Sequence, residues 1–372
     1  MINPRGYTMK QIEDTLRMRL HSRKVSFRYD LLNRNDIKIG TLDGMTKATV
    51  SYGEFRVIKR SASFSLSEYL QRNINFMNEQ IQPWFVLHMP DGGRVEWSLG
   101  IFSMKSPKRN ARGRITKRDI GAYDKTLILD EDVFTERFFI DAGTNYVAVI
   151  TRILNEAGIT KVDITESPLE LPNSREITIG TKKLHAVNDL LRAISYTSIT
   201  VDEAGFMRSG PYIEPARRPV TKVYSADRDS IILPDITESL DIAGRPNVFT
   251  RVSVDIERCA ELVSTFVNDD PLSPISTVNR GRRIVDFGEL QDMASQEALD
   301  NHVRRILAES TSAFSHLSFG TALMPNHGSA ETLLCTFPGV FEGSQKWSET
   351  SWEMPLEFNG VMKHEARRAN RI

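Results

Sequence analysis

One feature constrains the fold more than any other: apolar and polar residues alternate strictly in several separate segments. In segment 24–31 every second residue is apolar, from Val25 to Leu31, and the residues between them are polar. Successive side chains of a β-strand point to opposite faces, so this pattern indicates a strand with one buried face. The sequence therefore predicts a β-rich protein, because the alternation returns, with turn residues between, in segments 48–52, 84–88, 97–101, 248–256, 317–323 and 352–358.

The first third of the chain combines such strands with one helix. About Thr8 to His21 we expect a short helix or arm, because Ile12, Leu16 and Leu20 recur every four residues. A hairpin is predicted at Asp91–Gly93, where the two glycines tolerate positive φ.

Helical spacing dominates the middle of the chain instead. Thr144 is the predicted N-cap of a helix that starts near Tyr146 and ends at Gly158. A second helix is predicted at about 181–195, with short strands at 198–201 and 206–208 on either side of a turn. This middle region is therefore predicted to be a small mixed α/β unit.

After a proline-rich stretch at 215–219 the alternation resumes, and one long helix is predicted within it. This helix spans about Glu289–Ser310, with its apolar stripe running from Leu290 to Leu307. Two β-rich regions, each with a helix, thus flank the mixed unit, and the predicted fold class is α+β.

The composition fits an ordinary folded protein. Of the 372 residues, 40% are hydrophobic and 26% are charged, as in globular proteins. The 48 Lys and Arg residues balance 48 Asp and Glu residues, so no global field attracts nucleic acid or an anionic membrane. The N-terminal segment carries charges where a signal peptide has its apolar core, and no stretch approaches a membrane-spanning length. We expect a soluble chain that is made in the cytoplasm.

Patterns of cysteine, histidine and glycine predict no catalytic chemistry. Cys259 and Cys335 are too few for a disulfide framework and lack zinc-site spacing, so we expect two buried thiols. The seven histidines are scattered and form no helical His-Glu-Xxx-Xxx-His pair. The glycine-flanked serine of hydrolases and the glycine-rich loops of nucleotide-binding proteins are also absent. We therefore predict a protein that is not an enzyme, with no catalytic, cofactor-binding or metal-binding residues.

Two acidic clusters have alternative interpretations. Asp130, Glu131 and Asp132 could bind a hard cation, but they lack the spaced ligands and central glycine of a calcium loop, so a solvated loop is preferred. Segment 268–270, Asn-Asp-Asp before a proline, is more typical of a turn than of a metal site or an acid–base pair.

The densest positive run brackets a turn at 110–113. Phosphate binding is one interpretation, although no aromatic residue interleaves the run to stack on bases. A projecting solvated hairpin and a contact with another subunit are the other interpretations. The run consists of Lys105, Lys108, Arg109, Arg112, Arg114, Lys117 and Arg118.

Trp97, Trp347 and Trp352 could form a platform for a sugar ring. Trp97 and Trp352 lie in alternating strands, however, and such positions are more typical of a hydrophobic core.

Short motifs occur along the chain in a fixed order. The stretches that contain them are 97–104, 119–124, 139–146, 268–274, 277–281 and 321–328. In this shared order they resemble the tail-hub or baseplate-hub proteins of long-tailed phages and phage-like injection particles. That family has a strand ending in Leu-Gly-Xxx-Phe, a strand with Ala-Tyr-Asp and a helix start Pro-Ala-Gly-Thr-Asn. Asp141 stands here where the family has proline.

The resemblance implies two tube-like β-barrel domains with a small inserted α/β domain, assembled as a ring of three. The implied domains are 1–134 with about 212–240, the insert 135–211, and 241–372. Two similar barrels in each of three chains would give a pseudo-sixfold ring, which suits a sixfold tube on one side and a threefold tip on the other.

The function implied is that of a structural virion protein, a homotrimeric hub that closes the distal end of the tail tube around the DNA exit path. Its implied partners are the distal tail or tail tube ring, the tape measure protein, and a central spike, fibre or receptor-binding protein. Phage DNA would pass through the lumen without sequence-specific binding. Two alternatives stay open from the residues alone: a tail-tip cell-wall hydrolase or peptidase, and a carbohydrate-binding module.

Overall fold

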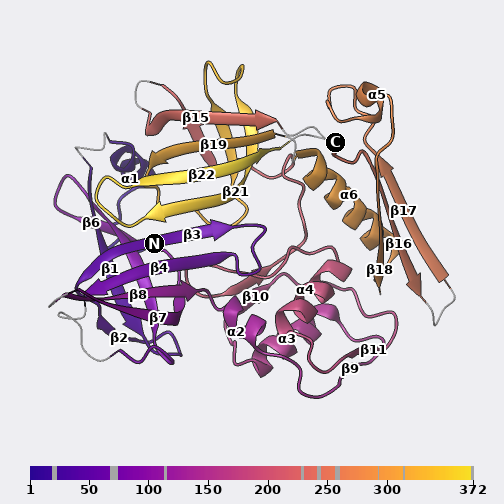
Figure 1. Ribbon diagram of the computed structural model, residues 1–372, viewed down its shortest axis with the longest axis horizontal. Coiled ribbons are helices and arrows are strands. Elements are labelled where there is room, and N and C mark those ends of the chain that lie inside the picture. Colours follow the sequence, from indigo (N-terminus) through magenta and orange to yellow (C-terminus); the bar gives the residue numbers. More distant parts are fainter. Residues whose placement is uncertain are drawn as a thin grey trace.

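The protein is a β-rich α+β protein in three packed parts (Figure 1). The computed structural model describes residues 1–18, 23–67, 74–112, 115–227, 230–240, 244–255, 260–291, 293–312 and 315–369. No helix among these residues is both long and apolar enough to span a membrane.

The first part is a large sheet that contains 14 described strands. Its first eight strands are β1 (Lys24–Leu32), β2 (Lys38–Thr41), β3 (Met45–Gly53), β4 (Arg60–Ser67), β5 (Gln80–His88), β6 (Arg94–Ser98), β7 (Phe102–Arg112) and β8 (Ile115–Tyr123). The other strands are β14 (Lys222–Ser225), β15 (Ile232–Leu240), β19 (Ser315–Ala322), β20 (Thr332–Thr336), β21 (Gln345–Pro355) and β22 (Val361–Arg368).

Hydrogen bonds connect the strands in the order β15-β19-β22-β21-β3-β4-β8-β7-β5-β1-β2. Three strands lie off this path: β6 pairs with β5, β20 pairs with β21, and β14 pairs with β20. In the described part of the chain this path is open at both ends. The antiparallel pairing of β3 with β21 joins strands from the two ends of the sequence. One hydrophobic core accordingly contains residues from both predicted β-rich regions.

Segment 212–240, which the resemblance implies is part of the first domain, contains β14 and β15, and these two strands pair with strands of the second β-rich region. β14 runs parallel to β20, and β15 runs antiparallel to β19.

Two local predictions for the first third are confirmed. The turn at Asp91–Gly93 closes the β5–β6 hairpin, where Gly92 has φ 80° and the Met89 amide donates to the Gly93 carbonyl. The N-terminal helix is α1 (Met9–Leu16), and it buries Ile12 and Leu16. Thr8 and Gln11 form a capping box at its N-terminus. The predicted helix extended to His21, and residues 19–21 lie outside the described part.

The second part is the mixed unit, which packs its own core between α3 and α4. The sequence predicted Thr144 as the N-cap of α3, and this is wrong: the Asn145 side chain accepts hydrogen bonds from the amides of Val147 and Ala148. Asparagine reaches these amides as well as threonine does, and it stands one residue nearer to them. The elements are α2 (Thr126–Glu131), β9 (Phe138–Ile140), α3 (Tyr146–Glu156), β10 (Val162–Ile164), β11 (Arg175–Ile177), α4 (Lys183–Ala193), β12 (Thr200–Val201) and β13 (Met207–Ser209).

The third part is a three-stranded sheet with a helix on one face. The predicted helix 289–310 starts too early, because residues 285–291 form a strand and the helix begins only at Gln296. Alternation in Val285, Asp286, Phe287 and Gly288 outweighs the helical spacing of Leu290. The elements are β16 (Val248–Asp255), β17 (Ala260–Val267), α5 (Thr277–Arg280), β18 (Val285–Gln291) and α6 (Gln296–Ser312).

Candidate functional site

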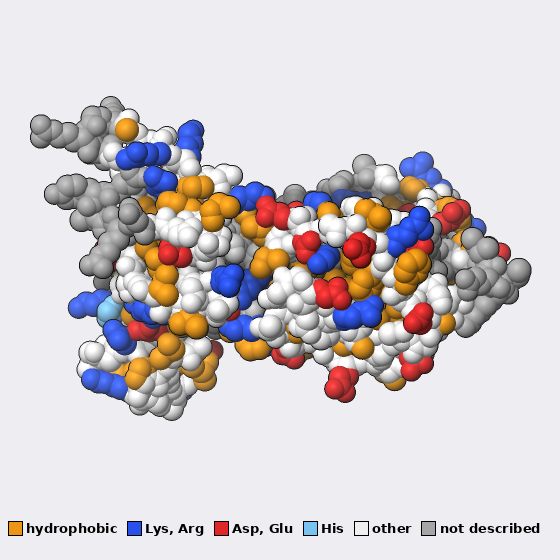
Figure 2. Space-filling model, turned by 90° about the horizontal axis from the view of Figure 1, so that it is seen from below, with side chains coloured by type: hydrophobic (Ala, Val, Ile, Leu, Met, Phe, Trp, Pro, Cys, Tyr) orange, Lys and Arg blue, Asp and Glu red, His pale blue; other side chains and the backbone are white. Residues whose placement is uncertain are grey.

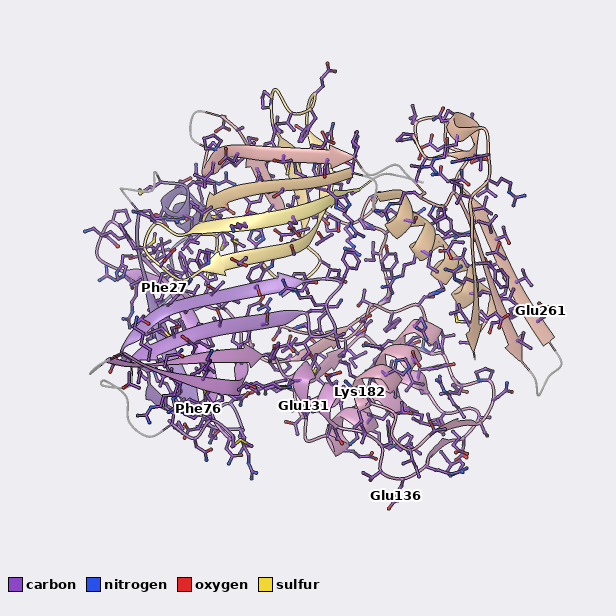
Figure 3. The ribbon with its side chains drawn as sticks, in the orientation of Figure 1. Phe27, Phe76, Glu131, Glu136, Lys182 and Glu261 are labelled. Carbon is purple, nitrogen blue, oxygen red and sulfur yellow. The ribbon has the colours of Figure 1, made fainter. Side chains whose placement is uncertain are left out.

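The acidic cluster does not form a metal site. Asp130 and Glu131 lie in the last turn of α2 rather than in a loop. Each carboxylate has its own lysine: Asp130 pairs with Lys182, Glu131 with Lys105, and Asp132 with Lys183 at 2.6 Å. Glu131 and Lys182 lie near the place where the mixed unit meets the large sheet (Figure 3). The carboxylates therefore hold separate lysines instead of converging on one ion.

Segment 268–270 is a turn, as predicted. The Asn268 side chain is buried and donates to the Ser273 hydroxyl at 3.0 Å. The Asp270 carboxylate accepts from the Leu272 amide at 2.8 Å, which is an Asx turn.

The basic run forms the hairpin of β7 and β8, which confirms the prediction of a hairpin there. The predicted turn at 110–113 starts too early, because β7 continues to Arg112, which pairs with Ile115. Lys105 forms an ion pair with Glu131, and the Arg118 guanidinium lies 4.7 Å from the centre of the Phe76 ring. Gly113 and Arg114 lie outside the described residues. Over much of the face seen in Figure 2, basic and acidic side chains are interspersed rather than gathered in one large positive field.

The three tryptophans belong to the core. Trp97, Trp347 and Trp352 are 7%, 0% and 3% exposed. None of them offers a ring face to a sugar, which confirms the core interpretation for Trp97 and Trp352. Cys335 is a buried free thiol, as predicted, while Cys259 lies outside the described residues.

The mixed unit is fixed to the large sheet by partly buried ion pairs. The Asp36 carboxylate, in the turn between β1 and β2, accepts from Lys125 at 2.6 Å and from Lys161 at 2.7 Å. Arg60 of β4 reaches Glu203, in the predicted turn of the mixed unit, at 2.9 Å. These contacts tie the mixed unit to the sheet, and each pair has one partner that is buried: Asp36 in the first two pairs and Arg60 in the third.

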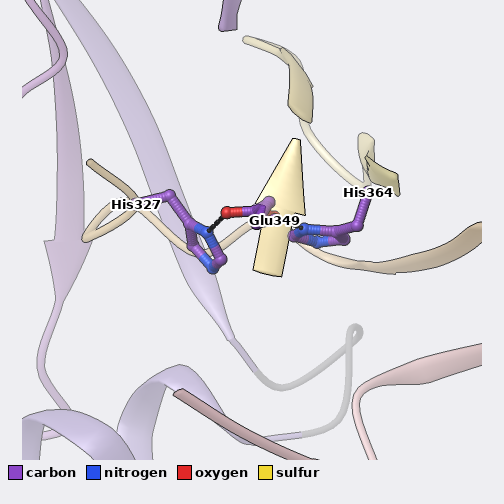
Figure 4. A group of neighbouring side chains, drawn as sticks. All are labelled: His327, Glu349 and His364. Atoms are coloured by element: carbon purple, nitrogen blue, oxygen red, sulfur yellow. Dashed lines mark hydrogen bonds and ion pairs between the residues drawn. The ribbon is translucent and has the colours of Figure 1, made fainter. Parts of the chain in front are cut away.

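Three residues that the sequence analysis did not single out meet inside the large sheet (Figure 4). His327 lies in the loop after β19, Glu349 in β21 and His364 in β22. The Nδ1 atom of His327 lies 2.8 Å from Glu349 Oε2, and the Nδ1 atom of His364 lies 2.6 Å from Glu349 Oε1. The potential ligand atoms of the three side chains all lie within 4.8 Å of one another. Residues 22 and 15 positions away from Glu349 thus converge on its carboxylate.

Hydroxyl groups contact the far nitrogens of both rings. The Tyr224 hydroxyl lies 2.7 Å from His327 Nε2, and the Thr321 hydroxyl lies 2.8 Å from His364 Nε2. The Phe319 ring stacks on His364 with centroids 4.7 Å apart. We call His327, Glu349 and His364 the His–Glu–His cluster. Tyr224, Thr321 and Phe319 enclose its two imidazole rings.

Burial sets the electrostatics of the cluster. Burial alone would raise the pKa of Glu349, but the two imidazoles hold it down to about 2, so the group is a carboxylate at neutral pH. Burial lowers the pKa of His364 more than Glu349 raises it, which disfavours an imidazolium. Among the described residues, these two histidines contact the Glu349 carboxylate, at 2.8 and 2.6 Å.

Two imidazoles and one carboxylate are ligands that transition metals take in proteins. The side chains of the cluster are only 0–1% exposed, so a substrate could not reach an ion there from solvent. The sequence offered no signal for this group, because its members do not share a helix turn or a short motif.

A second surface feature is the outer face of the three-stranded sheet, which we call the β16–β18 outer face (Val254, Val263, Val267, Val285 and Phe287). It points away from α6 and from the rest of the molecule (Figure 1). The exposed fractions of these five side chains are 41–60%. Pairing across the sheet sets Thr250 of β16 beside Thr265 and Phe287, so that most of the face is β-branched or aromatic. The exposed Glu261 and Glu289 stand on the same face, where they pair with Val254 and Val252.

Comparisons with known proteins identify the fold. No protein-family model matches the sequence, and no curated protein is similar to it. The structure resembles the tail protein from Neisseria meningitidis with a TM-score of 0.65 and 10% identity, over 92% of this chain and 97% of that chain. It also resembles the 43 kDa tail protein of prophage MuSo2 from Shewanella oneidensis, with a TM-score of 0.64 and 10% identity, over 92% and 98% of the chains.

A third similar structure is a chain in the PdpA–VgrG complex of Francisella. Its TM-score is 0.60 at 8% identity, and the match covers 94% of this chain and 53% of that chain. At such identities the similarity concerns the fold. The chain therefore has the fold of these prophage and bacterial tail proteins.

Proposed function

We propose that this chain is a structural protein of a phage or phage-like tail, and that it forms the trimeric hub that closes the distal end of the tail tube. One observation carries the proposal: 92% of the chain shares its fold with nearly the whole length of two tail proteins. A fold that is shared end to end leaves little of the chain for a separate catalytic domain.

The strand arrangement supports an architecture of two tube-like domains. One group of strands comes from residues 24–123 and the other from 222–368, and β3 and β21 join the two groups. We propose that each group forms one tube-like domain, that the mixed unit is an insert, and that three chains form a pseudo-sixfold ring.

Open sheet surfaces support association with other subunits. In the described part of the chain, β15 and β2 end the strand path of the large sheet, and β17 and β18 are the outer strands of the small one. Unpaired strand edges and the apolar β16–β18 outer face are surfaces that monomeric proteins rarely leave uncovered. We assign the outer face to a neighbouring copy of this chain in the ring.

The proposed partners are the distal tail or tail tube ring, the tape measure protein and a central spike, fibre or receptor-binding protein. The similarity to a chain of a complex with VgrG supports a place beside the tip machinery. The proposed location is the tail tip of the virion, with DNA passing through the ring.

The assembly state of the purified full chain tests this function. Native mass spectrometry and electron microscopy are expected to show trimers with threefold rings. A monomer that cleaves purified cell walls would instead support the hydrolase alternative, and a monomer that a sugar protects against heat would support a carbohydrate-binding module.

A further inference from the structure

We propose that the His–Glu–His cluster binds one divalent transition-metal ion, best zinc(II), as a structural site inside the large sheet. The donor atoms are Nδ1 of His327, Nδ1 of His364 and the carboxylate of Glu349, which lie within 4.8 Å of one another. Nitrogen and oxygen donors of this kind suit zinc(II), and the second carboxylate oxygen can complete four ligands.

The hydrogen bonds around His364 indicate where its proton lies. The Thr321 hydroxyl is 2.9 Å from the Ala322 carbonyl, which can only accept, so the hydroxyl proton points to that carbonyl. The same hydroxyl oxygen is 2.8 Å from His364 Nε2 and must then accept a hydrogen bond from it. Nε2 of His364 therefore carries a proton.

A protonated Nε2 leaves Nδ1 of the neutral ring with a lone pair. That lone pair would face Glu349 Oε1 at 2.6 Å, and two acceptors repel each other at this distance. A positive centre between them removes the repulsion. This centre is either a second proton on the ring, which fits the 2.6 Å separation, or a metal ion that both atoms bind, which would hold them about 3.3 Å apart.

Burial makes a positive centre beside the carboxylate necessary. The Glu349 side chain is 1% exposed, and both histidine side chains are 0% exposed. A buried carboxylate is costly unless a positive group compensates it. Either centre does so, because a second ring proton leaves the cluster neutral and a divalent ion leaves it with one positive charge. The metal ion is favoured by a third donor, because Nδ1 of His327 lies 2.8 Å from the other oxygen of the same carboxylate.

The outer contacts have the form that metal-bound histidines need. A ligating imidazole usually donates its other N–H to an oxygen, which fixes the ring orientation. Tyr224 and Thr321 provide such oxygens at 2.7 and 2.8 Å from the two Nε2 atoms. Because the cluster is closed to solvent, the ion would link β21, β22 and the loop that carries His327, rather than act on a substrate.

The test uses the full chain, purified without chelator from medium that contains zinc. Elemental analysis by mass spectrometry is expected to find one zinc ion per chain. Removal of the ion by a chelator is expected to lower Tm, and zinc(II) added back is expected to restore it. Cobalt(II) in the apoprotein is expected to give the visible absorption of a tetrahedral site.

Thr321→Val serves as the main variant because it keeps the shape of the side chain and removes only the hydroxyl. We expect its zinc affinity to fall by about 10–100-fold, while the matched exposed variant His185→Gln keeps full zinc content. His364→Gln is expected to lose the ion, and its Tm should no longer respond to zinc. A wild-type chain that contains no metal and whose Tm ignores zinc(II) would overturn the proposal in favour of a protonated ring.

Discussion

Trp352 stacks on Tyr52 across the pair of strands that joins the two ends of the chain. The rings are 6.1 Å apart with planes 23° from parallel, and the two residues are direct partners in the β3–β21 register. The Arg60 guanidinium lies 5.7 Å from the Trp352 ring centre, and the indole N–H donates to the Gly328 carbonyl at 3.1 Å. One side chain thus connects both strand groups of the large sheet.

Trp352→Ala is expected to lower the free energy of unfolding by about 3–5 kcal/mol, because it empties a core position at this junction. If the ring forms from intact sheets, the variant should also fail to assemble. Urea unfolding and native mass spectrometry measure the two effects. Phe358→Ala is the control, since Phe358 is 62% exposed and should change stability by less than about 0.5 kcal/mol. A Trp352→Ala chain that is as stable as the wild type would contradict the core assignment.

Element types followed from the sequence where a single pattern dominated. The strand at 24–31 and the turn at Asp91–Gly93 were predicted because alternation and glycine punctuation agreed there. The predicted helix start near Leu290 was wrong because strand and helix patterns overlap in the same few residues. Pairing with β16 makes these residues a strand. The predicted N-cap of α3 was one residue too early, because Thr144 and Asn145 are both good capping residues.

The His–Glu–His cluster could not be predicted from spacing. His327 and His364 are brought together because β21 pairs with β22 and because the loop after β19 places His327 against Glu349 (Figure 4). The pairing of β14 and β15 with later strands is likewise a long-range contact, and local alternation does not identify a strand's partner.

Asp36→Asn tests how the mixed unit is held on the sheet. Asp36 has φ 62°, which asparagine tolerates, so the variant removes mainly the charge that Lys125 and Lys161 contact. Burial raises the pKa of Asp36, but the two lysines lower it below its usual value, so the carboxylate is ionised at neutral pH. Because the variant leaves the buried Lys125 without its carboxylate, the free energy of unfolding should fall by about 3 kcal/mol. Urea unfolding measures this change.

Asp43→Asn is the matched control for this change, because Asp43 is an exposed carboxylate in the same part of the chain. It should alter stability by less than about 0.5 kcal/mol. Equal stabilities of the two variants would mean that the Asp36 pairs contribute nothing.

Phe287→Lys tests the β16–β18 outer face as a subunit contact. A charge at the centre of an apolar interface opposes association, so the variant should stay monomeric at concentrations where the wild type forms rings. Its Tm should match that of the wild type, because Phe287 is already 60% exposed. Phe358→Lys places the same charge on a phenylalanine that is 62% exposed elsewhere, and it should assemble. Rings formed by Phe287→Lys would exclude this face from the contact.

The stability of the folded chain is expected to depend on pH because of His302, in the third part of the molecule. It lies on α6 and is 9% exposed, and the charged groups that act on it are Arg305 of the same helix, Arg192 of α4 and Arg251 of β16. Burial, and then these three arginines, lower its pKa from 6.5 to about 4. The folded chain therefore keeps His302 neutral where the unfolded chain protonates it.

Because the unfolded state binds the extra proton, stability is complete above pH 6.5 and falls as the pH drops from 6.5 towards about 4. The loss amounts to about 3 kcal/mol at the acid end of this window. His302→Gln cannot take up the proton, so its urea midpoint should change less between pH 7 and pH 4.5 than that of the wild type, about 2 kcal/mol less in free energy. His185→Gln removes an exposed histidine and should keep the wild-type slope. Parallel pH profiles for His302→Gln and the wild type would show that another group causes the acid loss.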